Sequence, residues 1–502
     1  MVMLELIFDE VQVRRSGLAN RLQSCNYTLT LPINYMRVVF LIGVILYLII
    51  LLFTRFYQVA YTARFTQDES GFLVRLHQIY DERKITLIGQ VNEQGKVFGS
   101  LTVYLLLPFA IIGDFDPQSL FYGAAFWGVV TALVLLILGY QINQKLVFPL
   151  ALFSLFWFPL VQTGRWAWNP NFVHFWIGLG LICYLIKKPI SYLLLGIFFG
   201  LSIHHHYYAI FAAGFFCFLA GVEAIFKKKP HLAGFLWFGF ALTLLPFFLF
   251  DLRHPPGLFF LGASKQSAAF QIRPGFWNDS WELILYFTQS VYGAICFLLL
   301  GSILLIDDIR MRSKALIFLG PIIFQRLALW IAAPYFFHYY LVTIPFLLVW
   351  IIYPRNQKML IVSYCTIAIL VIASLFQIIS LITKPPVTPD LPTQVVITDT
   401  LKKDLDRGLS PQPNIAVLAS LDHDVQAVRY RDILLGRYRF QFDSRDEYFH
   451  SNHLYVVSTA SEKEVRSDVA PEIHNFTQGP LVNKFPIAKT PWVIYHFSKA
   501  QP

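Results

Sequence analysis

The sequence predicts a polytopic α-helical membrane protein with about eleven spans and a small α/β domain at its C-terminus. Three observations predict this class. Of the 502 residues, 56% are hydrophobic and only 14% are charged, whereas soluble domains carry about 25% charged residues. Apolar segments recur through the first 382 residues, and basic residues fall in every second short loop between them. A soluble enzyme and a disordered chain are therefore both excluded.

Each predicted span is an apolar run of about 20 residues, the length needed to cross ~30 Å of hydrocarbon. In chain order the runs lie at residues 38–54, 119–140, 146–163, 171–186, 190–203, 207–226, 232–250, 284–305, 315–333, 336–353 and 359–382. Residues 97–112 are also apolar. A span there would reverse every later loop, so we expect this segment to lie at the membrane interface.

The basic residues predict the orientation. They precede the first span and then return in alternate loops, at Arg14, Arg15, Arg21, Arg37, Lys145, Lys187, Lys188, Lys227, Lys228, Lys229, Arg310, Arg312, Lys314, Arg355 and Lys358. The positive-inside rule makes these loops cytoplasmic in a multi-pass plasma (inner) membrane protein. Topology thus accounts for the net charge of +10, and no nucleic-acid partner is expected.

This orientation divides the chain into three parts. Residues 1–37 form a cytoplasmic segment, and residues 38–382 form the membrane domain with its first external loop at 55–118. Residues 383–502 lie outside and open with a proline-rich linker. Their strand-like runs (414–419, 454–458 and 492–497) alternate with helix-like runs (394–406 and 422–436), which predicts the α/β domain. The five cysteines include no CxxC pair, so neither a disulfide framework nor a thiolate metal site is indicated.

The first external loop contains a pair of acids at the start of a predicted amphipathic helix. Thr66 and Glu69 have the spacing of a capping box, which places Asp68 and Glu69 in the first turn. The apolar positions that follow, from Phe72 to Tyr80, form one stripe that we expect to lie on the membrane. Acids in a first turn also complement the helix dipole. At a membrane surface, however, one carboxylate could act as a general base on an attacking hydroxyl.

The segment from Arg165 to Asn171 reads RWAWNPN and follows the third predicted span. For Trp166 and Trp168 the pattern favours an interfacial aromatic belt. An external arginine near a membrane end can bind phosphate through two hydrogen bonds. Arg165 is therefore a candidate ligand for a phosphate.

Two histidine–tyrosine segments follow at the ends of later spans. In the first, His204, His205 and His206 are consecutive. Neighbouring side chains on a helix point about 100° apart, so the three cannot share one metal ion there. Histidines between apolar spans usually face a cavity, and we expect one or two of them to contact phosphate or sugar oxygens. His338 and Tyr339 form the second candidate segment, for which an aromatic belt is the alternative interpretation.

A last group of cations lies where the seventh predicted span ends. Arg253 and His254 follow Asp251 there, and Lys265 lies further along the same loop, before Arg273. Cations clustered outside, against the usual bias, favour an anion site over a solvated connection. Arg326, inside the ninth predicted span, is another candidate, although an arginine that snorkels to the interface is also consistent with it.

These segments together resemble the GT-C membrane glycosyltransferases, and specifically the bacterial glycosyltransferase family 39 group. That group is related to protein O-mannosyltransferases, the lipid A aminoarabinose transferase and the rhizobial galacturonosyltransferases. The resemblance lies in the acid pair, the Arg-x-x-x-Asn-Pro segment, the His-Tyr segment and the Asp-Leu-Arg-His segment, and it covers roughly residues 38–350. The family's acidic motif maps onto Asp68 and Glu69. Where relatives have one histidine before the tyrosine, this chain has three.

The resemblance implies a hexosyl or pentosyl glycosyltransferase of the cell envelope, acting on the outer face. Its donor would be a polyprenyl-phosphate-linked sugar, and its acceptor a hydroxyl of a lipid, glycan or protein. Asp68 would take or orient the acceptor proton while Arg165, Arg253 and Lys265 stabilise the departing phosphate, with inversion at the anomeric carbon. No cofactor is required by this chemistry, and a divalent cation at the acid pair stays open.

Two other classes are alternatives. A multi-span transporter or lipid flippase would explain the spans and the histidines, but transporters usually carry inverted repeats and midplane sites. This sequence shows no internal repeat, and its polar residues gather at one face. A receptor or scaffold with a working tail would not need eleven spans as its anchor. The identity of the sugar and of the acceptor does not follow from the sequence, because specificity depends on pocket shape.

Overall fold

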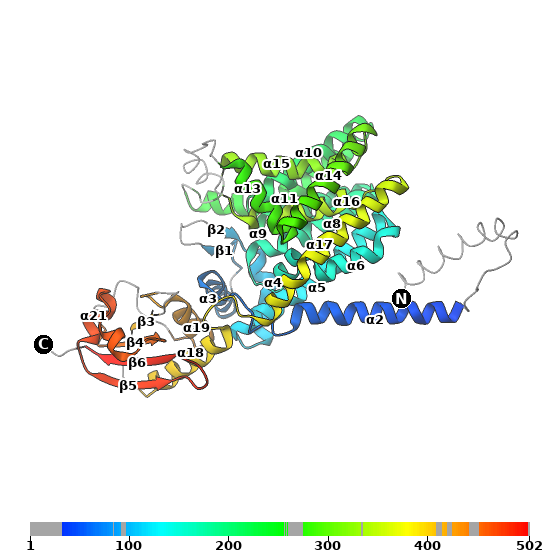
Figure 1. Ribbon diagram of the computed structural model, residues 1–502. Coiled ribbons are helices and arrows are strands. Elements are labelled where there is room, and N and C mark those ends of the chain that lie inside the picture. The colour runs from blue at the N-terminus through cyan, green and yellow to red at the C-terminus, as the bar shows by residue number, and fades with distance from the viewer. Residues whose placement is uncertain are drawn as a thin grey trace. The chain divides into compact units, whose positions relative to one another are not determined.

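The computed structural model describes residues 33–83, 85–91, 97–255, 257, 259, 275–332, 335–407, 414–418, 424–440 and 451–499 (Figure 1). The elements in the first half of these ranges are α2 (Ile33–Phe56), α3 (Gln67–Glu82), β1 (Ile88–Val91), β2 (Val97–Gly99), α4 (Leu101–Ile112), α5 (Pro117–Ile142), η1 (Gln144–Leu146), α6 (Val147–Phe156), α7 (Phe158–Thr163), η2 (Asn169–Phe172), α8 (Val173–Ile186), α9 (Pro189–His205), α10 (Ala209–Phe226) and α11 (Pro230–Arg253). The remaining elements are α13 (Phe276–Thr288), α14 (Val291–Arg310), α15 (Leu316–Ala332), η3 (Phe337–Thr343), α16 (Ile344–Ile352), α17 (Gln357–Thr383), α18 (Leu391–Leu405), β3 (Asn414–Leu418), α19 (Val428–Tyr438), β4 (His453–Ser458), α20 (Glu462–Arg466), α21 (Pro471–Thr477), β5 (Leu481–Pro486) and β6 (Val493–Ser498).

Seven helices in the described ranges are long and apolar enough to cross a membrane. They are Arg37–Phe56, Pro117–Ile142, Asn169–Ile186, Ala209–Phe226, Pro230–Arg253, Val291–Arg310 and Gln357–Thr383. The other four expected ranges hold shorter apolar helices, at Gln144–Phe156, Pro189–His205, Leu316–Ile331 and Phe337–Ile352. A multi-pass helical protein is thus confirmed, while the count of eleven spans stays a prediction. Helix α4, in the expected interfacial segment, has 12 residues, which is too few to cross the hydrocarbon.

Two of the expected spans are interrupted by a break in the helix. The third is divided at Trp157, whose extended backbone separates α6 from α7, and Pro159 lies in the first turn of α7. The eighth, expected at 284–305, is divided after Thr288, where α13 ends. Ser290 then starts α14, because its hydroxyl accepts a hydrogen bond from the N–H of Gly293 at 2.9 Å.

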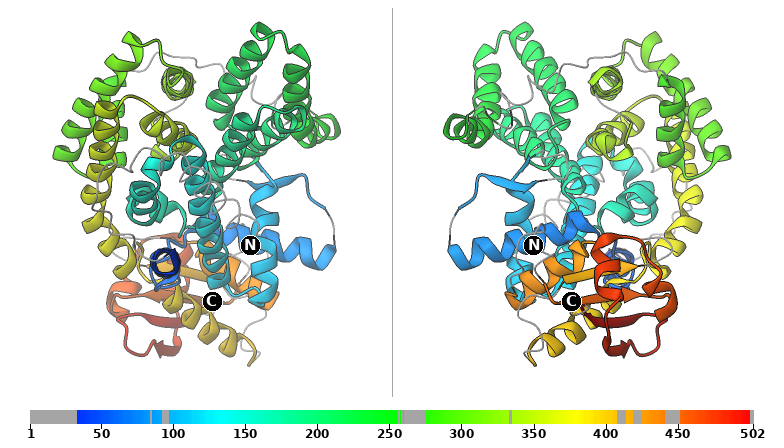
Figure 2. Two further views of the ribbon diagram at one scale, coloured as in Figure 1. Left: turned by 90° about the vertical axis from the view of Figure 1, so that its right-hand side faces the viewer. Right: turned by 90° about the vertical axis from the view of Figure 1, so that its left-hand side faces the viewer.

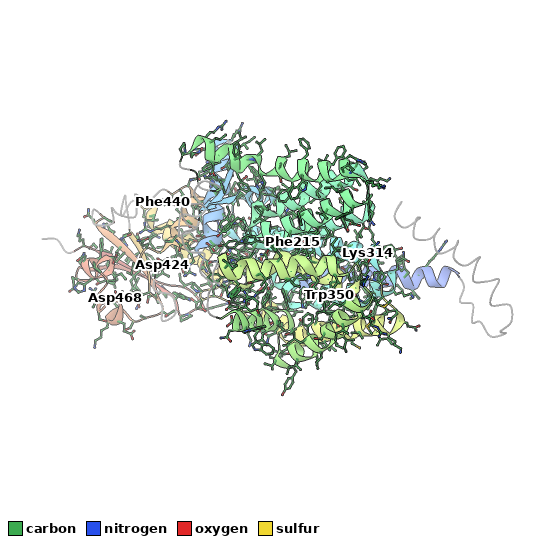
Figure 3. The ribbon with its side chains drawn as sticks, turned by 90° about the horizontal axis from the view of Figure 1, so that it is seen from above. Phe215, Lys314, Trp350, Asp424, Phe440 and Asp468 are labelled. Carbon is green, nitrogen blue, oxygen red and sulfur yellow. The ribbon has the colours of Figure 1, made fainter. Side chains whose placement is uncertain are left out.

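The described residues divide into two units, with the boundary between Ile50 and Leu51. In the first unit, the apolar side chains of α2 are largely exposed, as expected for a helix surrounded by lipid. In the second, a continuous apolar core joins the spanning helices. Aromatic side chains contribute to it: Phe216 of α10 and Phe346 of α16 are fully buried, and their ring centroids lie 5.2 Å apart. At the edge of this core, Phe215 of α10 stacks on Phe324 of α15 with ring centroids 4.5 Å apart (Figure 3).

A buried ion pair joins two of the basic turns between spans. The Arg355 guanidinium binds both carboxylate oxygens of Asp308, at 2.9 and 2.7 Å, and Trp350 Nε1 donates to the same carboxylate at 2.9 Å. The turn that contains Lys145 is tied to this end as well, because Tyr364 donates its hydroxyl to the Lys145 carbonyl at 2.5 Å. We call this side of the molecule the basic end.

The C-terminal segment contains a four-stranded sheet in the order β3-β4-β6-β5 (Figure 1). Figure 2 shows this sheet, in orange and red, from two further sides. Strands β3 and β4 are parallel, and the other neighbouring pairs are antiparallel. Alternate side chains of β4 point to opposite faces, so Tyr455 and Val457 pack with α18 and α19 while Leu454 and Val456 pack with α20 and α21. Strands β3, β4 and β6 lie where the sequence predicts strands, and β5 is an additional one. That residues 383–502 form a separate domain stays a prediction.

Helix α3 is held inside the protein rather than on a membrane surface. Its apolar side chains Phe72, Leu73 and Leu76 are fully buried. They share a core with α4 and α5 and with side chains of α18 and α19, including Ile433, and α3 and α19 lie side by side in Figure 1. The expected membrane-lying stripe is therefore wrong, because a second helix from the C-terminal segment covers the apolar face.

Candidate functional site

The predicted acid pair lies in the first turn of α3. Glu69 is fully buried, and its Oε2 accepts hydrogen bonds from the Thr66 N–H at 2.7 Å and from the Thr66 hydroxyl at 2.6 Å. The predicted capping box is thereby confirmed. Asp68 is only partly buried. The two neighbouring carboxylates thus occupy different environments, one enclosed and one partly open to solvent.

Two stacked tryptophans bind the acid pair. Trp166 Nε1 donates to Glu69 Oε1 at 2.7 Å, and Trp168 Nε1 donates to Asp68 Oδ2 at 3.3 Å. The indoles stack with centroids 4.3 Å apart, so each ring supports one carboxylate. The interpretation of these tryptophans as an aromatic belt is therefore wrong. Their spacing of two residues, which places both rings on one side of an extended segment, is the signal that could have indicated this role.

Arg165 binds backbone and side-chain oxygens of the protein instead of lying at the phosphate site expected for it. Its side chain is 4% exposed. Nη1 donates to the carbonyls of Thr54 and Arg55, each at 3.0 Å. Nη2 donates to the Tyr57 carbonyl at 2.8 Å and to the Thr62 hydroxyl at 2.6 Å. Carbonyls in the last turn of a helix lack intrahelical partners, and Arg165 donates hydrogen bonds to such carbonyls at the end of α2. The expected role of Arg165 as a ligand of the donor phosphate is therefore corrected.

Arg64, which the sequence analysis did not select, lies beside the acid pair. Its guanidinium carbon is 4.8 Å from the centroid of the Trp166 ring, an attractive position for a cation over an indole face. Unlike Arg165, Arg64 has an exposed side chain. Its neighbours in the sequence give no signal of this role, because only the folded position of Trp166 distinguishes Arg64 from other loop arginines.

Histidine and tyrosine side chains from two further segments complete the site. His338 meets Trp168 edge-on, with centroids 4.4 Å apart, and lies 5.3 Å from the His206 ring. Tyr339 packs on His206 at 4.9 Å and on Tyr208 at 4.6 Å. Segments far apart in the sequence therefore meet at one place. We call the whole set the acid–aromatic cluster: Asp68, Glu69, Trp166, Trp168, His206, Tyr208, His338 and Tyr339.

A glutamine in α15 joins the two aromatic segments of this cluster. Gln325 is fully buried. Its Nε2 donates to the carbonyls of Tyr208 at 3.1 Å and Tyr339 at 2.7 Å. Its Oε1 accepts the N–H of Ala212 at 2.9 Å. The positions of the two tyrosines therefore depend on a buried amide that no sequence pattern singles out.

The three consecutive histidines diverge, in agreement with the helical geometry expected for them. His204 Nε2 lies 2.7 Å from a backbone carbonyl of α11. His205 uses both ring nitrogens, Nδ1 with the Thr102 hydroxyl at 2.6 Å and Nε2 as acceptor from Trp176 at 2.7 Å. His205 therefore has a structural role, and the prediction that it binds a phosphate or sugar is corrected. Only His206 belongs to the acid–aromatic cluster.

The cations expected at the end of α11 do not join the cluster in the described part of the chain. Arg253 is exposed in the last turn of α11. His254 lies against the preceding turn, with Nδ1 3.0 Å from the Phe250 carbonyl. Lys265 falls outside the described residues, as does Arg273. Arg326 anchors the start of α13, donating at 2.6 Å to a backbone carbonyl there.

Burial changes the acidity of Glu69. Removal of the carboxylate from water disfavours its ionised form and raises the pKa of Glu69 to about 7. Hydrogen bonds from Thr66 and Trp166 lower the pKa because they stabilise the carboxylate, whereas the neighbouring charge of Asp68 raises it further. Glu69 therefore changes its charge near neutral pH.

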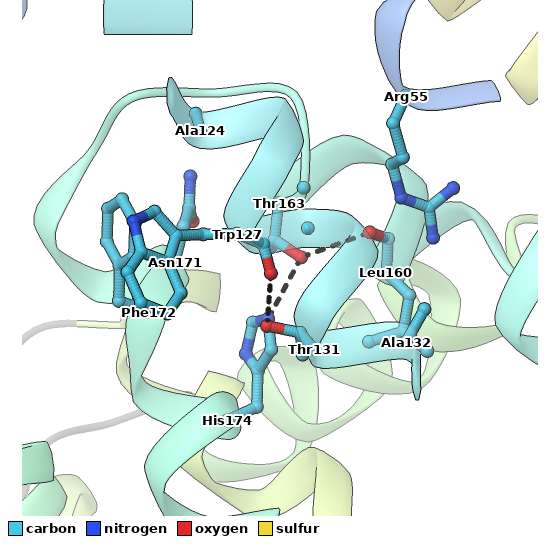
Figure 4. Close-up of a pocket in the computed structure, with 12 residues that line it drawn as sticks. Arg55, Ala124, Trp127, Thr131, Ala132, Leu160, Thr163, Asn171, Phe172 and His174 are labelled. Atoms are coloured by element: carbon cyan, nitrogen blue, oxygen red, sulfur yellow. Dashed lines mark hydrogen bonds between the residues drawn. The ribbon is translucent and has the colours of Figure 1, made fainter. Parts of the chain in front are cut away.

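A small cavity with both polar and apolar lining residues lies beside the tryptophan segment, to which Asn171 connects it (Figure 4). Arg55, Thr163, Asn171 and His174 are among its lining residues. The Thr163 hydroxyl and His174 Nε2 are 3.2 Å apart, and Asn171 Nδ2 donates to the Trp166 carbonyl at 2.8 Å. The cavity wall is thus continuous with the segment that binds Glu69.

Comparisons with known proteins identify the fold. Two crystal structures of ArnT from Cupriavidus metallidurans, one bound to undecaprenyl phosphate and one in the apo state, each align with a TM-score of 0.59 and 10% sequence identity. The alignments cover 90% and 91% of this chain and 98% of each ArnT chain. No protein-family model matches the sequence, and the comparison with curated proteins found no match either. The expected resemblance to GT-C membrane glycosyltransferases is confirmed at the level of the fold.

Proposed function

We propose that this chain is an inverting glycosyltransferase of the plasma (inner) membrane. It moves a sugar from a polyprenyl-phosphate-linked donor to an acceptor hydroxyl of a lipid, glycan or protein on the outer face. The observation that carries the proposal is the acid–aromatic cluster, in which an acid pair from the first loop meets aromatic segments from three later parts of the chain. The fold shared with ArnT, whose crystal structure holds undecaprenyl phosphate, supports the class of donor.

Asp68 is the proposed general base. It is the more accessible carboxylate of the pair, and the Trp168 N–H fixes one of its oxygens at 3.3 Å. The acceptor oxygen attacks the anomeric carbon and gives its proton to Asp68. The bond from that carbon to the phosphate oxygen breaks, and its electron pair leaves with the phosphate. A single displacement inverts the configuration, and no cofactor is needed for it.

Glu69 has a different role in this proposal. Its two oxygens accept hydrogen bonds from Thr66 and Trp166, so it fixes the start of α3 and the tryptophan segment relative to Asp68. His206, His338 and Tyr339 offer ring N–H and hydroxyl groups to sugar or phosphate oxygens. Arg64, which is exposed beside the acid pair, stabilises the charge that develops on the departing phosphate. A phosphate contact from Arg253, His254 or Lys265 stays a prediction from the sequence.

The proposed orientation places the cluster and the C-terminal α/β domain on the external, periplasmic side. The basic end defined by Lys145 and Arg355 then faces the cytoplasm, in accordance with the positive-inside rule. The N-terminus is cytoplasmic in this arrangement, and the eleven predicted spans carry the chain to an external C-terminal domain.

The first test is a transfer assay with purified protein and polyprenyl-phosphate sugars of several kinds. Free polyprenyl phosphate and glycosylated product are followed by mass spectrometry. We expect Asp68→Asn to lower turnover by about 10²–10⁴-fold, the usual contribution of a general base. Glu82→Gln, an exposed acid at the other end of α3, is the matched control and should retain turnover.

Wild-type turnover in Asp68→Asn would remove this residue from the mechanism. If well-folded protein releases no polyprenyl phosphate from any donor with candidate acceptors present, the glycosyltransferase proposal fails. A transport assay with the same lipids would then test the flippase alternative.

A further inference from the structure

Helix α19 of the C-terminal segment is hydrogen-bonded to the helix that carries the acid pair. The Ser70 hydroxyl donates to the Asp432 carboxylate. At the other end of α3, His77 Nδ1 bonds the Gly436 carbonyl, and His77 Nε2 accepts from Arg439 Nε at 3.1 Å. Both ring nitrogens of His77 are thus used by α19 and the residue that follows it. The two helices are joined along their length by polar contacts.

The same interface is closely packed. A side chain added at Gly436 would place its Cβ 2.6 Å from Leu73 Cγ, which is far inside van der Waals contact. Arg437, the next residue, pairs with Asp116 and Asp399, each at 3.4 Å. Asp116 lies at the start of α5, so α19 also contacts the first spanning helix after α3. The C-terminal segment is therefore fixed to the elements around the site.

Arg429 brings a positive charge to the acid pair from this interface. It lies three residues before Asp432, and residues three apart share one face of a helix. Asp432 bonds Ser70, the residue next to Glu69, so this face of α19 is directed at the first turn of α3. Arg429 is 6% exposed, and its charge interacts attractively with Glu69. Arg429 is thus a buried cation on the face of α19 that packs against the first turn of α3.

Four charged groups lie on the segments that pack around Glu69. Asp68 lies beside it on α3 and has the same sign. Arg64 sits over the Trp166 ring that binds Glu69. From α19 come Arg429, which attracts the Glu69 carboxylate, and Asp432, whose carboxylate is bound by Ser70. Arg429 is the cation that the C-terminal segment contributes to this group.

We propose that the C-terminal segment is a working part of the site, in which Arg429 is a positioning residue for the acid pair. Its guanidinium favours the ionised form of the Glu69 carboxylate, and the ionised carboxylate holds Thr66 and Trp166 in place around Asp68. The catalytic meaning of this inference rests on the proposed glycosyltransferase function. The electrostatic coupling of Arg429 to Glu69 can be tested without any donor or acceptor.

The test uses the full-length protein labelled with 5-fluorotryptophan in detergent micelles. The ¹⁹F resonance of Trp166, assigned by its loss in Trp166→Phe, reports the ionisation of Glu69 because the indole N–H binds that carboxylate. We expect Arg429→Gln to move the titration midpoint up by about one pH unit, since a lost cation disfavours the ionised acid. Arg429→Met keeps the size of the side chain without the charge and gives a second variant, and Arg429→Lys should restore the midpoint.

Arg439→Gln is the matched control. It removes an arginine from the same interface, at the far end of α3 from Glu69, and should leave the midpoint unchanged. Equal midpoints in the wild type and both neutral Arg429 variants would overturn the proposal. Equal shifts in Arg429→Gln and Arg439→Gln would also overturn it, because helix docking alone would then explain the effect. A transfer assay across pH, run in parallel, should show the same shift if the glycosyltransferase function is correct, whereas failure of transfer leaves the ¹⁹F result standing.

Discussion

Two adjacent carboxylates in this protein differ in almost every property that matters for chemistry. Glu69 is fully enclosed and bound on both oxygens, while Asp68 is partly open and accepts a hydrogen bond from the Trp168 indole N–H. A helix places neighbouring side chains about 100° apart, which is enough to send one into the core and the other to the site. The pair therefore separates into a structural acid and a reactive acid, with Trp166 and Trp168 as their respective donors.

We expect Trp166→Phe to shift the pH dependence of transfer toward alkaline pH. Phenylalanine keeps the stacked ring but removes the N–H that stabilises ionised Glu69, so the pKa of Glu69, already about 7, should rise further. Hydrogen bonds to charged groups are worth about 1.5–3 kcal/mol, which corresponds to a shift of about one to two pH units. Turnover would then fall at pH 7 and recover at higher pH.

The measurement is turnover as a function of pH for the wild type, Trp166→Phe and Trp168→Phe. The last variant is the control, because it removes the donor to Asp68 and leaves the bonds to Glu69 intact. A profile of Trp166→Phe that coincides with the wild type would show that Glu69 does not control the titration.

At the scale of elements, the sequence predicts local features well. Helix ranges and the capping box of α3 follow from periodicity and from residues three positions apart, and both were found. The contacts of Trp166 with Glu69 and of Asp432 with Ser70 join residues 97 and 362 positions apart. No spacing rule encodes such pairings, which arise when whole elements pack. The same limit explains why Arg165 and His205 looked like ligands when the fold uses them to satisfy polar groups.

The packing of α19 on α3 gives a prediction at this scale. Gly436→Ala should loosen both helices, because its Cβ would lie 2.6 Å from Leu73 Cγ and overpacking costs about 1–3 kcal/mol. Gly214→Ala is the matched control, since that Cβ would have only one neighbour, at 3.9 Å. Both sites are helical, so both variants gain the same helix propensity.

Hydrogen exchange followed by mass spectrometry checks this outcome. Peptides from α3 and α19 should exchange faster in Gly436→Ala than in the wild type and in Gly214→Ala. Unchanged protection of these two helices in Gly436→Ala would show that the interface adapts without cost, and would weaken the view that α19 fixes α3.

At the scale of the whole molecule, charge and chemistry separate toward opposite ends. The basic turns, joined by the Asp308–Arg355 pair, lie at one end of the spanning helices. The acid–aromatic cluster lies where the same helices begin or finish on the opposite side. The alternation of basic loops predicts this arrangement from the sequence, because each span reverses the side of the chain. That rule does not predict which cavity, aromatic stack or helix lies next to the acids.

The orientation can be tested by the labelling of single cysteines in a background that lacks the five native ones. We expect Lys463→Cys, exposed on α20, to react with a membrane-impermeant maleimide in intact spheroplasts. Lys228→Cys, exposed between α10 and α11, should react only after the membrane is permeabilised. The reverse pattern would place the cluster on the cytoplasmic side and would contradict an outer-face reaction.

The packing of α19 on α3 also has a consequence for biosynthesis. Helix α3 ends at Glu82 and α19 begins at Val428, so the ribosome makes the acids long before it makes the helix that holds them. At a synthesis rate of about 5–20 residues per second, the interval lasts on the order of tens of seconds. During that time the nascent chain carries Asp68 and Glu69 without Arg429, Asp432 or Gly436. The protein therefore acquires its complete site only after α19 has been made, and we expect a chain that ends before Val428 to lack the assembled acid pair.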